Sequence, residues 1–283
     1  MKFSIITINL NNKIGLEKTI KSVISQTFKD YEFIIIDGNS TDGSKEVIEK
    51  YRSFISYFIS EPDGGIYEAM NKGTSVSNGD YCNFLNSGDC YHDSTVLDHL
   101  SKMNQKADVL TGCHDLVFGR NVGEHGVTML DLFRWSYNHQ ESFIRRELCI
   151  KHPYDVEYRL AADRKFFIEV FVKDNCMLSF TKKLIVDVEP GGTSSRHLDE
   201  CEREILHILH EFLPPRIFED YVRFAKCDSS LLEVLPLLSN TVGLQSLVCK
   251  FAALLLAVRN SRLYRFVFRK SKLEPRRFFF DKV

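Results

Sequence analysis

Carboxylates that follow short apolar runs are the residues of this chain whose types and spacing could do chemistry. Asp37 closes the largely apolar run 32–36, and Asp89 follows the apolar run 81–85 after a short polar turn. In an open α/β sheet, ligands bind outside the carboxyl ends of parallel strands, so polar residues at such ends are the first candidates for a site. Carboxylate oxygens at these positions suit a divalent cation and a ligand that carries phosphate.

The elements that must position these residues alternate between strand and helix. Strand patterns rich in apolar and β-branched residues occupy 3–8, 32–36, 55–59 and 81–85. Apolar residues at helical spacing follow the first strand, and the turns at 40–43 and 62–65 each open a further helix. This rhythm predicts an α/β fold with a doubly wound, mostly parallel sheet flanked by helices.

The remainder of the chain has a different pattern. Residues 107–127 combine short β patterns with glycines, which predicts hairpins, and residues 184–188 resemble a strand. From residue 196 onward the pattern is helical. We therefore divide the chain into an α/β domain, 1–195, and a helical C-terminal region, 196–283.

Composition indicates an ordinary soluble protein. With 283 residues, 44% hydrophobic and 27% charged, the chain can bury the core of one large domain or two smaller ones. The eight cysteines include no CxxC pair, which argues against a zinc cluster or a thioredoxin-like site, so we interpret them as reduced thiols. Residues 1–10 run directly into a strand, and no apolar run approaches the roughly 18 residues of a membrane-spanning helix. We expect a cytoplasmic protein without a cleavable signal.

The turn after the first strand carries amides where a dinucleotide-binding fold has glycines. Residues 9–13 read Asn-Leu-Asn-Asn-Lys in place of the GxGxxG pattern, which argues against a dehydrogenase. Asn and Thr side chains at a strand end can instead hydrogen-bond a nucleobase or a ribose. The alternative is that Asn9 and Asn11 only shape the turn.

Asp37 also has two interpretations. The segment 37–43 has the side-chain oxygens of a capped helix start, which requires no ligand. Asp37 itself follows apolar residues, where an unpaired charge is costly. We therefore expect a ligand hydroxyl or a base N–H as its partner.

Four motifs together resemble the inverting family 2 glycosyltransferases, which have the GT-A fold. The motifs are SIITINLNN (4–12), IIIDGNSTDGS (34–44), EPDGGIYEAMNKG (61–73) and FLNSGD (84–89), in the order and roughly the spacing of that family. The resemblance covers 1–100 strongly and 130–195 more weakly. It implies a Rossmann-like GT-A domain, in which 1–100 form the nucleotide-binding half and 101–195 the acceptor half, with a helical C-terminal extension.

The resemblance implies a nucleotide-sugar site at the ends of the first strands. In such enzymes these positions bind the base and ribose of the donor, which is usually a uridine diphosphate sugar. The residues that match this role are Thr7, Asn9, Asp37 and Asp63. Asn71 and Lys72 are expected near the nucleotide or its diphosphate.

The metal-binding DxD motif of the family falls on Asn86-Ser87-Gly88, so both of its usual carboxylates are replaced and the adjacent Asp89 remains. A divalent cation neutralises the leaving diphosphate in such enzymes, and hard cations prefer oxygen ligands. The resemblance therefore makes Asp89 the ligand of Mg²⁺ or Mn²⁺, with Asn86 as a carbonyl ligand. The replacement leaves the need for a metal open.

The resemblance also implies a catalytic base, because inverting transfer needs a group that takes the proton from the acceptor hydroxyl. The family usually supplies an Asp at a helix start, and the best match is Asp163, before the helical run 164–172. Asp155 and Glu157 are the nearest rivals. The alternative for Asp163 is a solvent-facing acid that interacts with the helix dipole.

Three further segments each have a functional and a structural interpretation. His139 and Gln140 resemble an element on the acceptor side of the family, and the alternative is a structural histidine. The glycine-rich segment 191–195 is either a lid over the diphosphate or a linker.

The third segment, 247–280, interleaves aromatic and aliphatic residues with Lys and Arg. From residue 250 onward, ten Lys and Arg residues stand against two acids. Such a segment can lie on an anionic membrane surface, and the alternative is that it packs on the catalytic domain. No nucleic-acid motif accompanies it, so nucleic acid is not an expected partner.

We therefore expect a glycosyltransferase that moves a sugar from a nucleotide diphosphate sugar, UDP-hexose or UDP-N-acetylhexosamine, to a saccharide acceptor with inversion. By analogy with bacterial enzymes of this resemblance, the acceptor is lipid-linked, the enzyme lies at the inner face of the cytoplasmic membrane, and the product is a surface polysaccharide such as lipopolysaccharide O-antigen or capsule.

Two other functions remain open. A nucleotidyltransferase would need a basic, glycine-rich loop after the first strand, and residues 9–15 supply only Lys13. A catalytically silent sugar-nucleotide-binding protein is favoured by the replaced DxD carboxylates.

Overall fold

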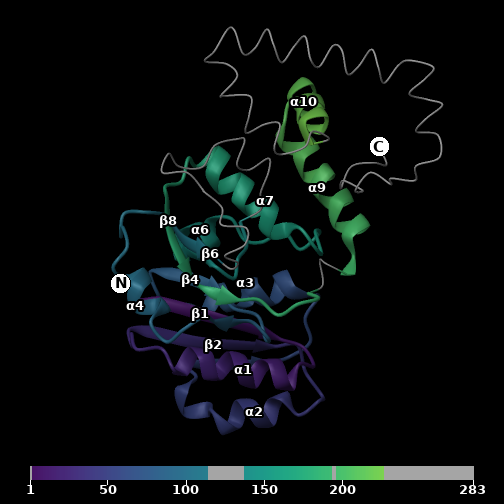
Figure 1. The fold of residues 1–283 in the computed structure, drawn as a ribbon. Helices are drawn as coiled ribbons and strands as arrows, with labels where there is room; N and C mark the ends of the chain where they lie inside the picture. The colour runs from purple at the N-terminus through teal and green to yellow at the C-terminus, as the bar shows by residue number, and fades with distance from the viewer. Residues whose placement is uncertain (1, 114–136, 193–195, 226–283) are drawn as a thin grey trace, which may run out of the picture. The chain divides into compact units, whose positions relative to one another are not determined.

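The computed structural model describes residues 2–113, 137–192 and 196–225, and the chain divides into two compact units, 1–208 and 209–283. The strands of the main sheet, all in the first unit, are β1 (Phe3–Asn9), β2 (Tyr31–Asp37), β3 (Tyr57–Ser60), β4 (Tyr81–Phe84), β6 (Val109–Cys113), β7 (Ser142–Arg145) and β8 (Leu178–Leu184). Among the described residues they lie in the order β3-β2-β1-β4-β7-β6-β8 (Figure 1).

Most neighbours in this sheet are parallel. β1 pairs in parallel with β2 and β4, β2 with β3, and β6 with β8, whereas β7 runs antiparallel to both β4 and β6. A second, small sheet pairs β5 (Cys90–Tyr91) with β9 (Val186–Asp187). The sheet is thus mixed and mostly parallel, which confirms the predicted α/β class.

Helices connect and cover the strands. Among the described residues before 193, the helices are α1 (Lys13–Ile24), α2 (Ser44–Lys50), η1 (Arg52–Phe54), α3 (Ile66–Val76), α4 (Val96–Ser101), α6 (Arg146–Lys151), α7 (Ala162–Ile168) and the π-helix η2 (Glu169–Lys173). α9 (Leu198–Phe212) contains the boundary between the units, and α10 (Pro215–Ala225) belongs to the second. Within the part of the chain that the structure describes, no helix combines the length and the apolarity needed to cross a membrane.

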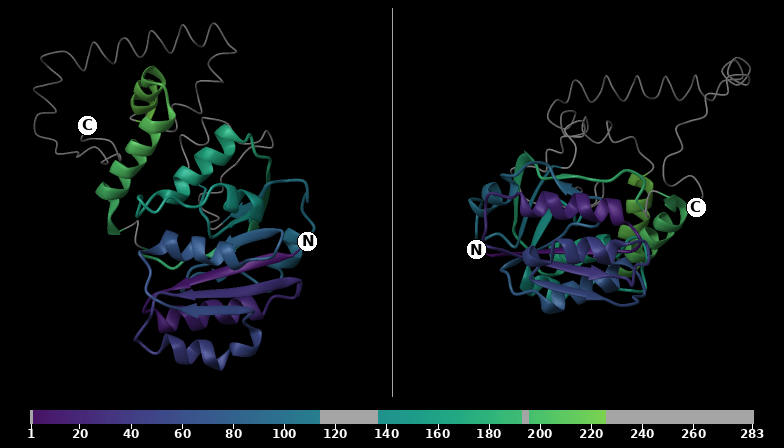
Figure 2. Two further views of the ribbon diagram at one scale, coloured as in Figure 1. Left: turned by 180° about the vertical axis from the view of Figure 1, so that it is seen from behind. Right: turned by 90° about the horizontal axis from the view of Figure 1, so that it is seen from below.

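The alternation of side chains along the strands decides which helix covers which face. Phe33 and Ile35, which point to the same face of β2, pack with Leu16 of α1 in the main core cluster. On the opposite face, Gly73 of α3 lies directly against Ile6 and Ile36, where an added Cβ would collide with Ile6. α1 and α3 therefore lie on opposite faces of the sheet (Figure 2).

The strand register brings polar residues to one edge of the sheet. Asn9 at the end of β1 pairs with Asp37 at the end of β2, and Asp37 pairs with Ser60 at the end of β3. The turn after β4 reaches the same edge, because the backbone N–H of Ser87 donates to the carbonyl of Ile8 (3.0 Å). The polar residues predicted at the strand ends thus lie together at one edge of the sheet.

Several element boundaries differ from the prediction. The predicted strand began at residue 55, but Ile55 is the buried residue that ends the short helix η1. β3 therefore begins two residues later, at Tyr57. The predicted strand 184–188 is divided, since Leu184 ends β8 and Val186 begins β9. The predicted helix 164–172 is α7 followed by a π-helical turn.

Other predicted segments are described only in part. β6 accounts for the start of the predicted hairpin region, and residues 114–136 lie outside the described residues. α9 and α10 match the helical pattern after residue 195, whereas the basic segment 247–280 lies outside the described residues.

Candidate active site

The ends of β1, β2 and β3 are joined by hydrogen bonds to one buried carboxylate. Asp37, which is fully buried, accepts from the side chains of Asn9 (2.7 Å), Ser40 (2.6 Å) and Ser60 (2.5 Å) and from the backbone N–H of Ser40 (2.9 Å). Burial by itself would raise the pKa of Asp37, but these hydrogen bonds outweigh it and lower the pKa. The partners that we expected from a ligand are supplied here by the chain itself.

Asn9 and Asp63 leave polar atoms at this edge. The side-chain oxygen of Asn9 is buried and has no hydrogen-bond partner among the described residues. Asp63 accepts from the backbone N–H of Gly65 (3.0 Å), and its other oxygen lies 2.8 Å from where a Cβ on Gly38 would stand. Burial raises the pKa of Asp63. The backbone N–H of Gly38 donates to the carbonyl of Asn9 at the end of β1 (2.8 Å). Because Gly38 has no side chain, there is room between Asp63 and the end of β1.

The other residues predicted to bind the nucleotide have partners within the chain. Thr7 is fully buried and donates to the carbonyl of Leu85 (2.8 Å), which ties β1 to the end of β4. Asn71 donates to the carbonyl of Tyr154 (2.8 Å) and accepts from its N–H (2.9 Å). In this structure Thr7 and Asn71 therefore hold neighbouring backbone segments together.

Lys72 lies beside the turn that carries Asp63. Its ammonium group is 2.9 Å from the carboxylate of Glu61 and 3.1 Å from that of Glu68, and these partners raise its pKa. Lys72 is therefore a cation near the predicted nucleotide site, already paired with two acids.

A chain of hydrogen bonds connects four segments around Asp163. The side-chain nitrogen of Asn86 lies 3.1 Å from Nε2 of His139, and Nδ1 of His139 lies 3.1 Å from Oδ2 of Asp163. The hydroxyl of Tyr67 donates to Oδ1 of Asp163 (3.1 Å). The sequence predicted Asn86, His139 and Asp163 separately, and the structure brings them together.

Tyr67 is the one of these four hydrogen-bonded residues that we did not predict. It lies in the EPDGGIYEAMNKG motif, and its position in that motif is the signal that could have identified it. Burial, together with the nearby carboxylate of Asp163, raises the pKa of Tyr67 well above its usual value. Its hydroxyl therefore stays protonated and donates. The network is satisfied when His139 carries its proton on Nδ1 and accepts from Asn86 at Nε2.

The two rivals for the role of Asp163 have other surroundings. The carboxylate of Asp155 is 2.6 Å from the ammonium group of Lys165, and this hydrogen bond helps to hold the pKa of Asp155 low against the effect of burial. Glu157 is exposed, and its backbone N–H donates to Asp155 (3.0 Å). Asp163 is the candidate that the hydrogen-bonded chain connects to the strand ends.

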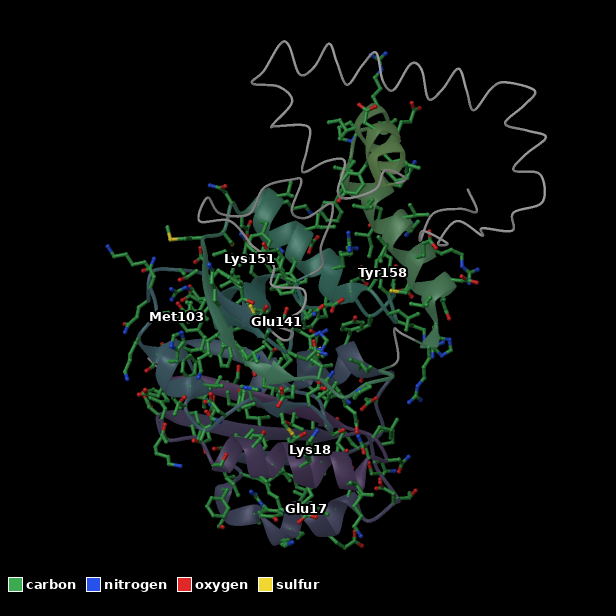
Figure 3. All side chains as sticks on the ribbon, viewed as in Figure 1. Glu17, Lys18, Met103, Glu141, Lys151 and Tyr158 are labelled. Carbon is green, nitrogen blue, oxygen red and sulfur yellow. The ribbon has the colours of Figure 1, made fainter. Side chains whose placement is uncertain are left out.

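The backbone of the turn 86–89 disfavours a carboxylate at position 88. Gly88 has φ +109°, a backbone conformation that side chains disfavour, and the carboxylate of Glu189 lies against it where any Cβ would be. The hydroxyl of Thr19 in α1 accepts from the N–H of Gly88 (2.9 Å) and donates to the carbonyl of Asp89 (2.7 Å). Lys18, labelled in Figure 3, donates to the carbonyl of Gly88 (3.3 Å). A carboxylate-bearing residue at position 88 would be strained in this backbone conformation and would have to displace the Glu189 side chain.

Asp89 and Asn86 are the groups in this turn that fit a divalent cation. Asp89 is buried, which raises its pKa, and its carboxylate accepts from the N–H of Glu189 (2.8 Å) and from the side chain of Gln140. The side-chain oxygen of Asn86 is buried without a partner among the described residues. No group of three or more His, Cys, Asp or Glu side chains there could hold a metal ion alone. These two oxygen groups fit a cation whose other ligands are substrate phosphates and water.

A cavity of about 190 Å³ lies beside Tyr67. Its walls come from the turn and start of α3, from the loop before α7 and from the start of α9. The residues concerned are Gly64–Glu68, Val156, Tyr158–Leu160, His197 and Glu200. The cavity therefore adjoins the residue that donates to Asp163, and it offers aromatic and charged side chains. Of the glycine-rich segment 191–195, residues 191 and 192 are described, and both are exposed.

Comparisons with known proteins identify the family and the fold of this chain. The family model described as Glycosyl transferase family 2 matches residues 4–171. An uncharacterized glycosyltransferase of Mycobacterium tuberculosis is 32% identical over 181 residues, which are 58% of this chain and 67% of that protein.

Two solved structures show the same fold. Staphylococcus aureus TarS 1–349 in complex with UDP-GlcNAc has a TM-score of 0.61 at 20% identity and covers 78% of this chain and 70% of its own. The mannosyltransferase PcManGT of Pyrobaculum calidifontis, in complex with GDP-Man and Mn²⁺, has a TM-score of 0.62 at 12% identity and covers 95% and 83%. The fold is GT-A, as predicted, and the chain belongs to the family 2 glycosyltransferases.

Proposed function

We propose that this family 2 glycosyltransferase transfers a hexose or N-acetylhexosamine from a UDP-sugar to a saccharide hydroxyl, with inversion at the anomeric carbon. The observation that carries the proposal is the hydrogen-bonded chain from Asn86 through His139 to Asp163. It joins a carboxylate to the turn 86–89 at the strand ends. Inverting transfer needs a base on one side of the anomeric carbon and a leaving diphosphate on the other, and this arrangement offers a group for each.

Asp163 is the proposed base. One carboxylate oxygen of Asp163 is hydrogen-bonded to Tyr67 and the other to His139. The Asp163 side chain is 17% exposed to solvent, so an acceptor hydroxyl can reach it. In the reaction the acceptor oxygen forms its bond to the anomeric carbon and gives its proton to Asp163. The bond from that carbon to the diphosphate oxygen breaks, and UDP leaves with the electron pair.

The nucleotide is proposed to lie at the ends of β1 and β2, with Asp37, Thr7 and Asn71 fixing the surrounding backbone. The unpartnered oxygen of Asn9 and the carboxylate of Asp63 flank Gly38 and can accept N–H or O–H groups of the base and ribose. TarS binds UDP-GlcNAc, whereas PcManGT binds GDP-Man, so a donor screen must include both nucleotides.

Asp89 and the side-chain oxygen of Asn86 would hold Mg²⁺ or Mn²⁺ together with the donor. The cation would neutralise charge on the departing diphosphate. Removing divalent metal with a chelator is expected to lower the transfer rate at least tenfold, and added Mn²⁺ is expected to restore it. Unchanged transfer in the chelator would show that the replaced DxD carboxylates have removed the need for metal.

The acceptor is proposed to be a lipid-linked saccharide used to build a surface polysaccharide such as O-antigen or capsule. The cavity beside Tyr67 supports a saccharide acceptor, because its lining offers aromatic faces and charged groups of the kind that bind sugars. The basic, aromatic sequence 247–280 supports peripheral contact with the inner face of the cytoplasmic membrane.

The experiment that tests the function is a screen of UDP- and GDP-sugars for acceptor-dependent release of nucleotide diphosphate. With the active donor, Asp163→Asn is expected to lower kcat by at least 10³-fold while donor affinity stays within about twofold. Glu157→Gln, the same kind of change at an exposed neighbouring acid, is the matched control and is expected to retain the wild-type rate. Full activity of Asp163→Asn would contradict the assignment. Donor binding without release for any donor would favour a catalytically silent binding protein.

A further inference from the structure

One face of α9 contacts the loop that leads into the proposed catalytic base. The carboxylate of Glu204 accepts from three consecutive backbone N–H groups, those of Arg159 (3.0 Å), Leu160 (2.9 Å) and Ala161 (2.9 Å). Asp163 follows two residues later. The carboxylate thus comes from a helix far along the chain and holds the backbone immediately before the base.

Two neighbours of Glu204 on α9 hold the same loop. Nδ1 of His207 lies 2.8 Å from the hydroxyl of Tyr158, and the thiol of Cys201 donates to the carbonyl of Leu160 (3.9 Å). Residues 201, 204 and 207 are three apart, so they lie on one face of the helix. The label of Tyr158 in Figure 3 marks the part of this loop that contacts α9.

The loop's own hydrogen bonds lie earlier in it, where the backbone N–H of Glu157 donates to the Asp155 carboxylate (3.0 Å) and that of Tyr158 to the Asp155 carbonyl (3.2 Å). Leu160 and Ala161 are buried, and the Ala-Ala sequence before Asp163 offers no side chain that could bond the N–H groups preceding α7. Buried backbone donors without a partner are costly, so the loop would move toward water if the carboxylate were lost. A shift of this backbone would move Asp163, and small misplacements of a catalytic group have large effects on rate.

We propose that Glu204 is a positioning residue of the transfer reaction, which holds residues 159–161 so that Asp163 meets the acceptor hydroxyl. This rests on the proposed function of Asp163 as base. Glu204 touches neither substrate nor the reacting atoms and acts through the backbone. Donor binding at the strand ends does not depend on it, so its loss lowers kcat and leaves the donor KM unchanged.

The test compares full-length variants Glu204→Ala and Glu204→Gln with Glu49→Ala, a matched removal of an exposed carboxylate on α2. For Glu204→Ala, kcat is expected to fall between 10- and 100-fold. Its donor KM is expected to stay within about twofold of wild type. Glu204→Gln keeps one acceptor oxygen and is expected to recover part of the rate. Glu49→Ala is expected to match the wild type.

Hydrogen exchange of the same proteins measures the contact between Glu204 and residues 159–161 independently of catalysis. The amides of residues 159–161 are expected to exchange at least tenfold faster in Glu204→Ala, with α1 unchanged. Slow exchange there in Glu204→Ala would show that the carboxylate does not hold the loop and would overturn the proposal. Fast exchange with kcat within twofold of wild type would also overturn it, since the contact would then be structural only. If Glu204→Ala does not fold, Glu204→Gln supplies both readouts.

Failure of the proposed function gives a different pattern. If the wild-type chain transfers no sugar, the function is wrong and exchange alone decides whether Glu204 holds the loop. If Asp163→Asn retains full activity while Glu204→Ala loses it, Glu204 acts on something other than Asp163 and the proposal is overturned. Loss of kcat in both variants, with donor KM kept, is the result that supports it.

Discussion

Tyr67 and Tyr154 are neighbouring buried tyrosines whose hydroxyl groups differ in hydrogen bonding. Their ring centroids are 5.4 Å apart. The Tyr67 hydroxyl donates to Asp163, whereas that of Tyr154 has no hydrogen-bond partner in the described part of the chain. The pair therefore separates the contribution of one hydrogen bond from that of a buried aromatic ring.

Tyr67→Phe is expected to lower kcat roughly tenfold, because Asp163 loses a donor that fixes its carboxylate. Tyr154→Phe removes the same atom one ring away and is expected to leave kcat within about twofold. Steady-state kinetics of both variants with the active donor is the measurement. Equal effects of the two changes would mean that the hydroxyl of Tyr67 has no special part in the reaction.

Asp37 links stability to pH. Its pKa is lower in the folded chain than the ordinary value near 3.9, so its hydrogen bonds stabilise the fold fully above about pH 4. That contribution is lost as pH falls through the folded-state pKa. Asp37→Asn replaces an acceptor by a donor and is expected to cost about 2 kcal/mol at pH 7.

Urea unfolding of the wild type and of Asp37→Asn between pH 7 and pH 3 checks this linkage. The difference in unfolding free energy is expected to be constant down to about pH 4 and to shrink below it. A difference that grows as the pH falls would have the wrong sign for a depressed pKa. Glu49→Gln, at an exposed site on α2, is the control and is expected to change little.

At the scale of elements, α1 holds the turn that replaces the DxD motif. The Thr19 hydroxyl bonds both the N–H of Gly88 and the carbonyl of Asp89. Thr19→Val keeps the shape of the side chain and is expected to cost about 1–3 kcal/mol, since it leaves buried backbone groups unpaired. It is also expected to weaken donor binding through the turn 86–89.

Thr74→Val in α3 is the matched control, because the Thr74 hydroxyl donates to the carbonyl of Met70, one turn earlier in its own helix (3.1 Å). That change is expected to cost well under 1 kcal/mol. Thermal unfolding and calorimetric binding of UDP compare the two variants. Equal losses in both would show that the turn does not depend on α1.

The elements that sequence could predict are those with a long local signal. β1, β2 and β4 are apolar runs because parallel strands are buried on both faces, and their ends located Asp37 and the turn 86–89. β3 is a partly exposed edge strand, so its start was placed two residues early. β5 and β9 have two residues each and pair across about a hundred positions, which leaves no periodic pattern to read.

The candidate site was predicted in the same uneven way. Asn86, His139 and Asp163 were predicted from motif positions, because the resemblance supplied them. Glu204 and Thr19 could not be found from sequence, since their importance lies in backbone groups that they meet only after folding. The partners of Asp37 were also missed, because a strand register was needed to place Ser60 beside it.

At the scale of the whole molecule, charge is divided along the sequence. Ten Lys and Arg residues and two acids follow residue 249, within a chain whose net charge is −1. Full-length protein is expected to sediment with vesicles that contain anionic lipid and not with neutral vesicles, and to be released by 0.5 M salt. Arg276→Glu with Arg277→Glu is expected to weaken this binding at least tenfold. Equal binding to neutral vesicles would contradict an electrostatic contact.

The hydrogen-bonded chain around Asp163 has a consequence for how the enzyme becomes active. Tyr67 and Asp163 are 96 positions apart, and Asn86 and His139 are 53 apart. Such contacts close large loops and form slowly compared with helices. A refolding chain therefore lacks the hydrogen-bonded arrangement of the proposed base until these contacts have formed. Transfer activity should recover no earlier than the last of these long-range contacts, so turnover would report when residues 67, 86, 139 and 163 have come together.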